Sequence, residues 1–345
     1  MTIHFAPPAR CPARTSRVQR LLPAAVSALA IVLIALIFRF APAHAEETAN
    51  WDLMKDHPLN TTVWTGDGKQ VDFETLLDQA RNASNVLIGE NHDNPDHHRI
   101  QAKIIAALVE QGLHPAIVFE MIPPSYQQKL DSFLQQKSPD DSKLGKILDW
   151  EERGWPDWNI YRPIAKEAVV NGLPMLAGGI DRDFVNRLAT EGPDILSPES
   201  RKAWGLDQPL DTATRDDLLT ELEDAHCGVM PKSALGYMIP VQRARDGALA
   251  SAMLEGSAKA GSAVMIAGGG HVRKDRGAPV VLSRLDPGAS MLTIGLYPVR
   301  AEKNAFSDYL DGSDQLPFDY VIFTDASEPK DHCADLKARF GKTQK

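Results

Sequence analysis

The sequence predicts an α/β fold in which helices flank a mostly parallel central sheet, with a small N-terminal β-hairpin. Short runs rich in valine, isoleucine and alanine alternate with segments of helical periodicity. This alternation is typical of a parallel sheet that is covered on both faces. Several of the runs stop at a glycine, a glutamate or a histidine. A chain of 345 residues, 43% of them hydrophobic, can bury the core that such a sheet needs.

The first 45 residues differ in composition from the rest of the chain. They contain five arginines and no acidic residue, and residues 21–38 form a nearly continuous apolar run. Ala43 and Ala45 then supply small residues at a cleavage site. These features predict a signal peptide at residues 1–45 and an exported protein of the periplasm or cell envelope. An uncleaved helix is the alternative, and it would be the only membrane attachment that we expect.

Removal of this segment makes the chain strongly acidic, because the formal net charge changes from −9 to −14. We therefore expect no nucleic acid partner. The remaining cysteines, Cys227 and Cys333, can form a disulfide in an oxidising compartment, although two unpaired thiols fit the sequence as well. The chain contains no CxxC sequence, which argues against thiolate-bound zinc and covalently attached haem.

A hairpin and a series of strands are predicted in the single main domain, residues 46–326. β-Forming residues on both sides of a Gly-Asp-Gly turn predict the hairpin at residues 61–73. The apolar run at residues 86–89 predicts a short buried strand, and similar runs predict the strands that follow. We expect these at residues 116–119, 174–177, 263–267, 291–296 and 319–323.

Helices are predicted between the strands. Pro95 fits the first position of a helix, Gly112 fits the position after its last turn, and Asp181 fits an N-cap. A proline at position 240 predicts a kink in the longest helix. The helices are expected at residues 74–81, 95–111, 123–136, 158–171, 181–190 and 234–258, with mostly helical residues at 191–234 and a polar tail at 327–345.

Side chains that can carry chemistry follow four of the predicted strands. Glu90 and His92 follow one strand, Glu120 follows the next, and His271 comes after a strand that ends in three glycines. Arg182 follows a further strand. Because the carboxyl ends of parallel strands meet at one edge of a sheet, we expect these side chains to converge from distant parts of the chain.

Glu90, His92, Glu120 and His271 fit two kinds of chemistry. Carboxylates and imidazoles bind divalent ions such as zinc, manganese or iron. The same groups serve in metal-free acid–base catalysis, with Glu90, Glu120 and His271 as the catalytic residues. The spacing matches no compact metal motif such as HExxH. For each residue, an ordinary hydrogen-bonded side chain at a strand end is the structural alternative.

Five further residues are candidates for ligand binding. His97 and His98 begin a predicted helix, where the helix dipole favours an anion, although a solvated first turn fits equally. Arg182 can bind a carboxylate with two hydrogen bonds or pair with a structural aspartate. Arg245 lies on a polar face of the longest helix, which also carries Gln242 and Asp246. Tyr161 belongs to an aromatic group that either lines a flat apolar ligand or packs as a structural loop; its other members are Trp150, Trp155 and Trp158.

Seven segments occur in the same order as in a known family. They are GENHDNPDHH (89–98), FEM (119–121), GWPDWNIYRPI (154–164), LAGGIDR (176–182), HCGVMP (226–231), VQRARDGALASAM (241–253) and GGGHVRKDRGAP (268–279). With them the chain resembles the ChaN-like haem-binding uptake proteins of the Tiki superfamily, also called iron-regulated lipoproteins. Each segment is weakly specific, whereas the ordered set is fairly specific and spans most of the main domain.

The resemblance implies an α/β domain at the cell envelope that binds haem and serves iron acquisition. It also implies that a tyrosine binds the haem iron, for which Tyr126, Tyr161, Tyr237 and Tyr297 are candidates. Haem at a dimer interface occurs in such proteins, which implies a homodimer. The sequence departs from the lipoproteins of the family at one point: Cys11 precedes the apolar run, so we expect no lipid anchor.

The wider superfamily suggests an alternative function. Some of its members resemble metal-dependent peptidases, and the erythromycin-esterase group uses a glutamate and histidine pair at matching strand ends. Glu90 and His92 match the first motif, Glu120 the second and His271 the last. We therefore expect an exported haem-binding protein involved in haem or iron uptake. The alternatives are a metal-assisted or Glu/His-catalysed hydrolase and an envelope protein without activity.

Overall fold

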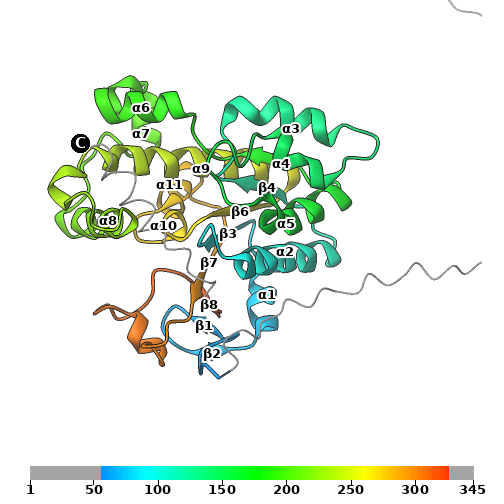
Figure 1. Ribbon diagram of the computed structural model, residues 1–345, viewed down its shortest axis with the longest axis horizontal. Helices are drawn as coiled ribbons and strands as arrows, with labels where there is room; N and C mark the ends of the chain where they lie inside the picture. Colours follow the sequence, from blue (N-terminus) through cyan, green and yellow to red (C-terminus); the bar gives the residue numbers. More distant parts are fainter. Residues whose placement is uncertain (1–55, 326–345) are drawn as a thin grey trace, which may run out of the picture. The chain divides into compact units, whose positions relative to one another are not determined.

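An eight-stranded sheet organises the part of the chain that the computed structural model describes, residues 56–325. The strands lie in the order β2-β1-β8-β7-β3-β6-β4-β5 (Figure 1). The six from β8 to β5 are parallel, while β1 is antiparallel to β8 and forms a hairpin with β2. The predicted fold class, including the hairpin, is confirmed. The strands are β1 Val63–Thr65, β2 Gln70–Val71, β3 Asn85–Glu90, β4 Ala116–Phe119, β5 Met175–Ala177, β6 Ala263–Gly268, β7 Met291–Pro298 and β8 Tyr320–Thr324.

Helices connect the strands (Figure 1). The α-helices are α1 Phe73–Asn82, α2 Pro95–Glu110, α3 Gln127–Leu134, α4 Leu144–Ile147, α5 Trp158–Val170, α6 Arg182–Glu191, α7 Pro198–Ala203, α8 Thr212–Ala225, α9 Met238–Ala260, α10 Gly269–Val272 and α11 Ala278–Leu285. Short 3₁₀ helices lie at Pro124–Tyr126, Asp141–Lys143, Pro193–Ile195, Lys232–Ala234 and Phe306–Tyr309.

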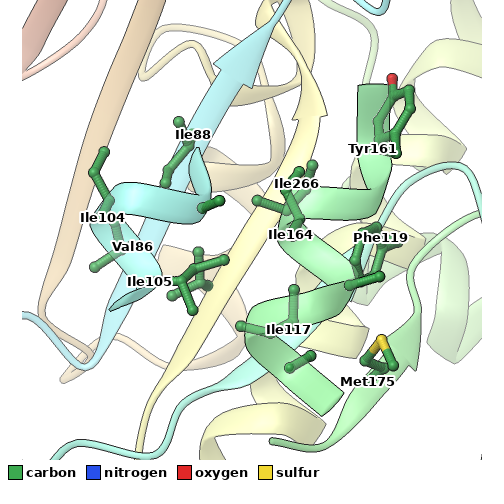
Figure 2. Close-up of a cluster of buried hydrophobic side chains, with 14 of the residues drawn as sticks. Val86, Ile88, Ile104, Ile105, Ile117, Phe119, Tyr161, Ile164, Met175 and Ile266 are labelled. Atoms are coloured by element: carbon green, nitrogen blue, oxygen red, sulfur yellow. The ribbon is translucent and has the colours of Figure 1, made fainter. Parts of the chain in front are cut away.

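The central strands contribute apolar side chains to a core on each face of the sheet, because successive side chains of a strand point to opposite sides. Val86 and Ile88 of β3 pack in one core with α2 and α5, whereas Leu87 packs in the other with α9 and α11. Figure 2 shows the first core, in which Ile104 of α2 and Ile164 of α5 lie over the strands. Burial of one such side chain stabilises the fold by roughly 1.5–3 kcal/mol.

The residues that cap and begin the helices mostly agree with the sequence predictions, with a few differences. Asn94 caps α2, since its side chain accepts the backbone N–H groups of Asp96 and His97. Asp181 precedes α6 as expected, but its carboxylate accepts a hydrogen bond from Ser125 instead of capping the helix. The longest helix begins at Met238, after a short 3₁₀ turn, rather than at residue 234.

The later start of α9 changes the role of its proline. Pro240 lies in the first turn, where a missing N–H removes no helical hydrogen bond, so the reason for the predicted kink disappears. A proline also occurs inside α5, at Pro163, which the prediction of that helix did not use. The predicted helix at residues 123–136 consists of a 3₁₀ turn followed by α3.

Several predictions concern residues outside the described range. The predicted signal peptide, residues 1–45, and the polar tail, residues 327–345, both lie there. Cys227 is disulfide-bonded, and Cys333, with which the sequence allows it to pair, is also outside the described range. Among the described helices, none combines the length and the apolar character that crossing a membrane requires.

Candidate functional site

Three neighbouring strands bring the strand-end side chains together. β3, β6 and β4 are adjacent in the sheet, and Glu90 at the end of β3 pairs with Gly268 at the end of β6. Glu120 directly follows β4, and His271 lies in α10, which directly follows β6. The parallel sheet thus places residues that are up to 181 positions apart at one edge, where α/β proteins bind their ligands.

Glu90 is buried and surrounded by donors. Its Oε1 accepts hydrogen bonds from His92 Nδ1 at 2.9 Å and from the Tyr161 hydroxyl at 2.6 Å. Its Oε2 lies 3.2 Å from Nε2 of His98. Burial by itself would raise the pKa of Glu90, but the histidines outweigh it and hold the pKa well below its usual value. The carboxylate is therefore ionised at neutral pH.

Glu120 connects the strand ends on the other side of the site. Its Oε2 accepts the backbone N–H of Gly268 at 2.8 Å, and its Oε1 lies 3.4 Å from His271 Nε2. Arg245 Nη1 is 3.7 Å from the same Oε1, and His92 Nε2 is 3.7 Å from Oε2. Burial favours a raised pKa, but the neighbouring positive charges, His271 first, lower the pKa of Glu120 below its usual range.

His271 is held between two carboxylates. Its Nδ1 donates to Asp246 Oδ1 at 2.7 Å, and its Nε2 faces Glu120. Burial lowers the pKa of His271, but the charges of Glu120 and Asp246 outweigh this and raise the pKa to about 10. For Asp246, burial dominates and raises its pKa. His271 is therefore an imidazolium at neutral pH, so it can polarise a ligand oxygen but cannot accept a proton there.

The contacts form one continuous chain, which we call the Glu/His site and define as Asp246, His271, Glu120, His92 and Glu90. Neighbouring members lie 2.7–3.7 Å apart. Only His92 is appreciably accessible, with its side chain 33% exposed. Burial lowers the pKa of His92, but the hydrogen bond to Glu90 and the charges of both glutamates raise it overall. A ligand from solvent would meet this imidazole first.

A glycine at the end of β6 permits this close arrangement. A Cβ at Gly268 would lie 3.1 Å from His92 Nε2 and 3.6 Å from Glu120 Oε2. The absence of a side chain lets the backbone N–H reach Glu120 while the imidazole occupies the space above it. Close packing at the site therefore explains the glycine at position 268.

The two histidines of the first turn of α2 are structural in their contacts. His97 is buried, accepts the backbone N–H of Asn91 on Nδ1 at 2.8 Å and donates from Nε2 to Thr324 Oγ1 at 3.0 Å. Burial, followed by the charge of His98, lowers the pKa of His97 to about 3, so it stays neutral. His98 is buried as well and supports Glu90. Neither imidazole is accessible to an external ligand.

The three other predicted ligand-binding residues lie in different environments. Tyr161 is fully buried and committed to Glu90. Arg245 is 29% exposed and faces Glu120, so it belongs beside the Glu/His site. Arg182 is exposed at the start of α6, after the edge strand β5, and makes no ion pair with any described residue. The sheet order explains this, because β5 is separated from β6 and β3 by β4.

The predicted metal site at Glu90, His92, Glu120 and His271 gains no support from the geometry. Within residues 56–325, no group of three or more histidine, cysteine, aspartate or glutamate side chains is arranged to hold a metal ion. The carboxylates and imidazoles contact one another in a chain instead of pointing at a common centre, as metal ligands do.

The aromatic group is structural in its packing, and two of its members, Trp158 and Tyr161, lie in α5 and not in a loop. Trp150 is fully buried, donates from Nε1 to the carbonyl of Pro156 at 2.8 Å and meets Tyr161 edge to face at 4.8 Å. Trp155 lies with its edge against His92, with the ring centres 5.1 Å apart. The group therefore supports the buried side of the Glu/His site and presents no flat ligand surface.

Asp246 is the site residue that reasoning from strand ends did not select. It comes from the middle of α9 and not from the end of a strand. The signal for it was the polar face that it shares with Arg245 in an otherwise alanine-rich helix. Two residues of that face reach the site, Arg245 at Glu120 and Asp246 at His271.

Solved structures with a similar fold include ChaN of Campylobacter jejuni, which was described with cofacial haem. It is 18% identical, has a TM-score of 0.58, and is matched over 77% of this chain and 97% of its own. The type III effector HopBA1 is 16% identical with a TM-score of 0.42, over 74% of this chain and 93% of that one. A mutant of the erythromycin esterase EreC in its open conformation is 14% identical with a TM-score of 0.42, over 81% and 87%.

At these identities, the likeness to ChaN of Campylobacter jejuni shows a common fold, which agrees with the sheet described above. No curated protein sequence matches the chain significantly. The model of one family, described as haem-binding uptake, Tiki superfamily, ChaN, matches residues 76–282. This range is more than half of the chain and contains every member of the Glu/His site. The chain therefore belongs to the ChaN family of haem-binding uptake proteins in the Tiki superfamily.

Proposed function

We propose that this protein is an exported haem-binding protein that serves haem or iron uptake at the cell envelope. The observation that carries the proposal is the family match over residues 76–282. The structure of ChaN of Campylobacter jejuni, with its cofacial haem, supports haem as the ligand. Export rests on the composition of residues 1–45, with their five arginines, apolar run and small residues at the cleavage site.

Tyr237 is the tyrosine that best fits an iron ligand. Its side chain is 45% exposed, and its hydroxyl has no hydrogen-bond partner among the described residues. The hydroxyls of Tyr126 and Tyr161 are bound to Asp149 and Glu90 instead. Burial raises the pKa of Tyr297 to about 12, which opposes the phenolate that iron ligation requires.

The start of α9 offers apolar support for a macrocycle. Met238 and Ile239, which follow Tyr237, are partly buried against a cluster that includes Leu235. A phenolate there would bind the haem iron and tune its electronic character, and the neighbouring apolar side chains would contact the macrocycle. The fit of Tyr237 to haem therefore rests on its free hydroxyl, its exposure and this apolar setting.

A homodimer is part of the proposal. The cofacial haem described for ChaN of Campylobacter jejuni requires two ring faces in contact. An exposed Tyr237 on each chain could bring two haem groups together, so that haem itself completes the contact between the chains. We therefore expect the dimer to form with haem rather than before it.

Titration of the purified protein with haemin tests this function. We expect a saturable, shifted Soret band at one haem per chain and a doubling of the mass in solution. Tyr237→Phe should weaken haem binding by roughly tenfold or more, since it removes a bond to a charged centre. Tyr320→Phe is the matched control, because that hydroxyl likewise has no hydrogen bond with a described residue. Equal binding by both variants would rule out Tyr237 as the ligand, and no saturable binding would refute the function.

A second candidate function is hydrolysis at the Glu/His site. The observation that favours it is the convergence of two ionised carboxylates and an imidazole that is charged at neutral pH around the accessible His92. Glu90 or Glu120 would activate water as the base, and His271 would polarise the scissile carbonyl.

A substrate screen with Glu90→Gln as the diagnostic variant tests hydrolysis. The change keeps the size of the side chain but removes the charge, so we expect turnover of a p-nitrophenyl ester to fall by roughly 100-fold or more. Haem affinity should stay the same, since Glu90 lies in the buried Glu/His site and not at Tyr237. If the variant turns the ester over as fast as the wild type, or if the wild type shows no turnover, the proposal of hydrolysis at this site is refuted.

A further inference from the structure

A cavity of about 350 Å³ adjoins the Glu/His site on the side of β7. β7 and β8 lie on the other side of β3 from β6 and β4 (Figure 1). Asn91, which follows Glu90, and Gly269 and Gly270, which precede His271, contribute to the walls. The cavity therefore shares the carboxyl edge of the sheet with the Glu/His site but uses different side chains.

One cation at this cavity has no acidic partner. Arg300 lines the cavity, is exposed, and forms no ion pair with any residue in the described range 56–325. The other charged side chains of the wall neutralise each other or a neighbour. These pairs are Arg273 with Asp217 and Asp275, Lys303 with Asp311, and Glu221 with Arg276. Among the described residues, Arg300 is thus the charged side chain of the wall that is left without an ion-pair partner and can meet an anionic ligand.

Tyr297 also lines the cavity. The hydroxyl of Tyr297 makes no hydrogen bond to a described residue. Its ring is held edge to face by Tyr309, Phe318 and Phe323, with ring centres 6.1, 5.9 and 6.2 Å away. Because burial raises the pKa of Tyr297 to about 12, the hydroxyl remains a hydrogen-bond donor at neutral pH.

Apolar side chains also line the cavity, and the backbone that carries Arg300 is fixed by a hydrogen bond. Leu296, Pro298 and Phe318 line the cavity beside the polar groups. The hydroxyl of Tyr309 accepts the backbone N–H of Arg300 at 2.9 Å, which holds the segment that carries the guanidinium. A ligand with a flat or apolar body could therefore bury that body here while its charged end meets Arg300.

We propose that this cavity binds a small molecule that joins a ring to a carboxylate or phosphate group. Arg300 pairs with the anionic group, Tyr297 donates a hydrogen bond to it, and Leu296, Pro298 and Phe318 contact the ring. The volume lies near the lower end of the range of small-molecule pockets, roughly 300–1,000 Å³. This site is separate from the haem ligand Tyr237 and does not depend on the proposed function.

Saturation-transfer NMR on the full-length protein tests the proposal with benzoate and phenyl phosphate as probes. Benzamide is the neutral control, since it has the shape of benzoate without the charge. We expect saturable binding of at least one anion with a dissociation constant on the order of 1 mM, and no binding of benzamide. The anion that binds with the lower dissociation constant shows whether the site prefers a carboxylate or a phosphate.

Two variants locate the binding. Arg300→Gln should weaken the anion roughly tenfold or more, and Tyr297→Phe about fivefold, as expected for a charged and a neutral hydrogen bond. Arg182→Gln, which also changes an exposed arginine without an acidic partner in the described range, should have no effect. Absence of saturable binding, or an equal response to Arg300→Gln and Arg182→Gln, would overturn the proposal.

The same probe separates this site from the haem site. Protein loaded with haemin should still bind the anion, and Arg300→Gln should leave the Soret titration unchanged. Displacement of the anion by stoichiometric haemin would overturn the proposal of a separate site. A protein that fails to bind haemin but binds the anion would refute the haem function and leave this inference intact.

Discussion

The side chains of the Glu/His site that carry a charge stay ionised in spite of burial, because each lies beside a group of opposite charge. Isolated burial would neutralise Glu90 and Glu120, yet the histidines beside them lower both pKa values. The reverse holds for His271, whose two carboxylate neighbours raise its pKa to about 10. Removal of any one member leaves its partners as buried charges without compensation, which is costly.

The effect of His271→Gln on the free energy of unfolding is expected to depend on pH. The pKa of His271 in the folded state, about 10, lies above the value of ~6.5 for an unfolded histidine. Its stabilising contribution is therefore complete below pH ~6.5 and is lost as the pH rises towards 10. We expect the variant to lose ~3–5 kcal/mol of unfolding free energy at pH 6 and progressively less towards pH 10.

Urea unfolding of the wild type and the variant across this pH range measures the difference. His226→Gln is the control, because His226 is a partly buried histidine whose Nδ1 contacts the carbonyl of Leu222 and which forms no ion pair with a carboxylate between residues 56 and 325. The free energy lost in the control should vary little with pH. A loss in His271→Gln that is constant between pH 6 and pH 10 would contradict a charged imidazole in the folded state.

At the scale of elements, α9 connects the two regions to which we assign function. Tyr237 lies just before its first residue, while Arg245 and Asp246 reach the Glu/His site two turns further along. The next residue, Gly247, lies against the ring of Trp204, whose Nε1 donates to Ser251 Oγ at 3.0 Å. The position of α9 over the sheet therefore depends on a small residue at this contact.

Gly247→Ala should destabilise the protein through this contact. Helix propensity alone favours alanine by roughly 1 kcal/mol. A Cβ at Gly247, however, would lie 2.3 Å from ring atoms of Trp204, so the ring or the helix must move. Overpacking of this kind costs typically ~1–3 kcal/mol, and we expect it to exceed the gain from propensity.

Thermal and urea unfolding measure this change. Gly236→Ala is the matched control, because a Cβ there would meet no atom within 4 Å. The control should be neutral or slightly stabilising, since alanine restricts the unfolded chain. A Gly247→Ala variant as stable as this control would show that Trp204 adjusts without cost.

At the scale of the whole described chain, the order of the strands determines which chemistry is possible. β3 lies between β6 and β7, so its carboxyl end faces the Glu/His site on one side and the cavity of Arg300 on the other. Covering helices fill both faces with apolar side chains and leave the strand ends as the place where polar groups gather. The proposed haem ligand lies apart from both, at the start of α9.

The sequence by itself determined the elements and the candidate residues. Alternating strands and helices, the hairpin turn and the residues after each strand are local features, so Glu90, Glu120 and His271 could be selected without a structure. The segments around them were also sufficient to indicate the family, which the match over residues 76–282 confirms.

Only the tertiary structure decided what these residues do to one another. Strand order is set by long-range packing, so the sequence could not show that β6 lies between β3 and β4 while Arg182 follows an edge strand. Burial is likewise a property of the assembled fold. It shows that His97 and Tyr161, which were candidates for ligand binding, make internal hydrogen bonds instead, whereas Tyr237 stays exposed. Local pattern fixes which groups are present, whereas packing fixes which of them meet each other and which meet solvent.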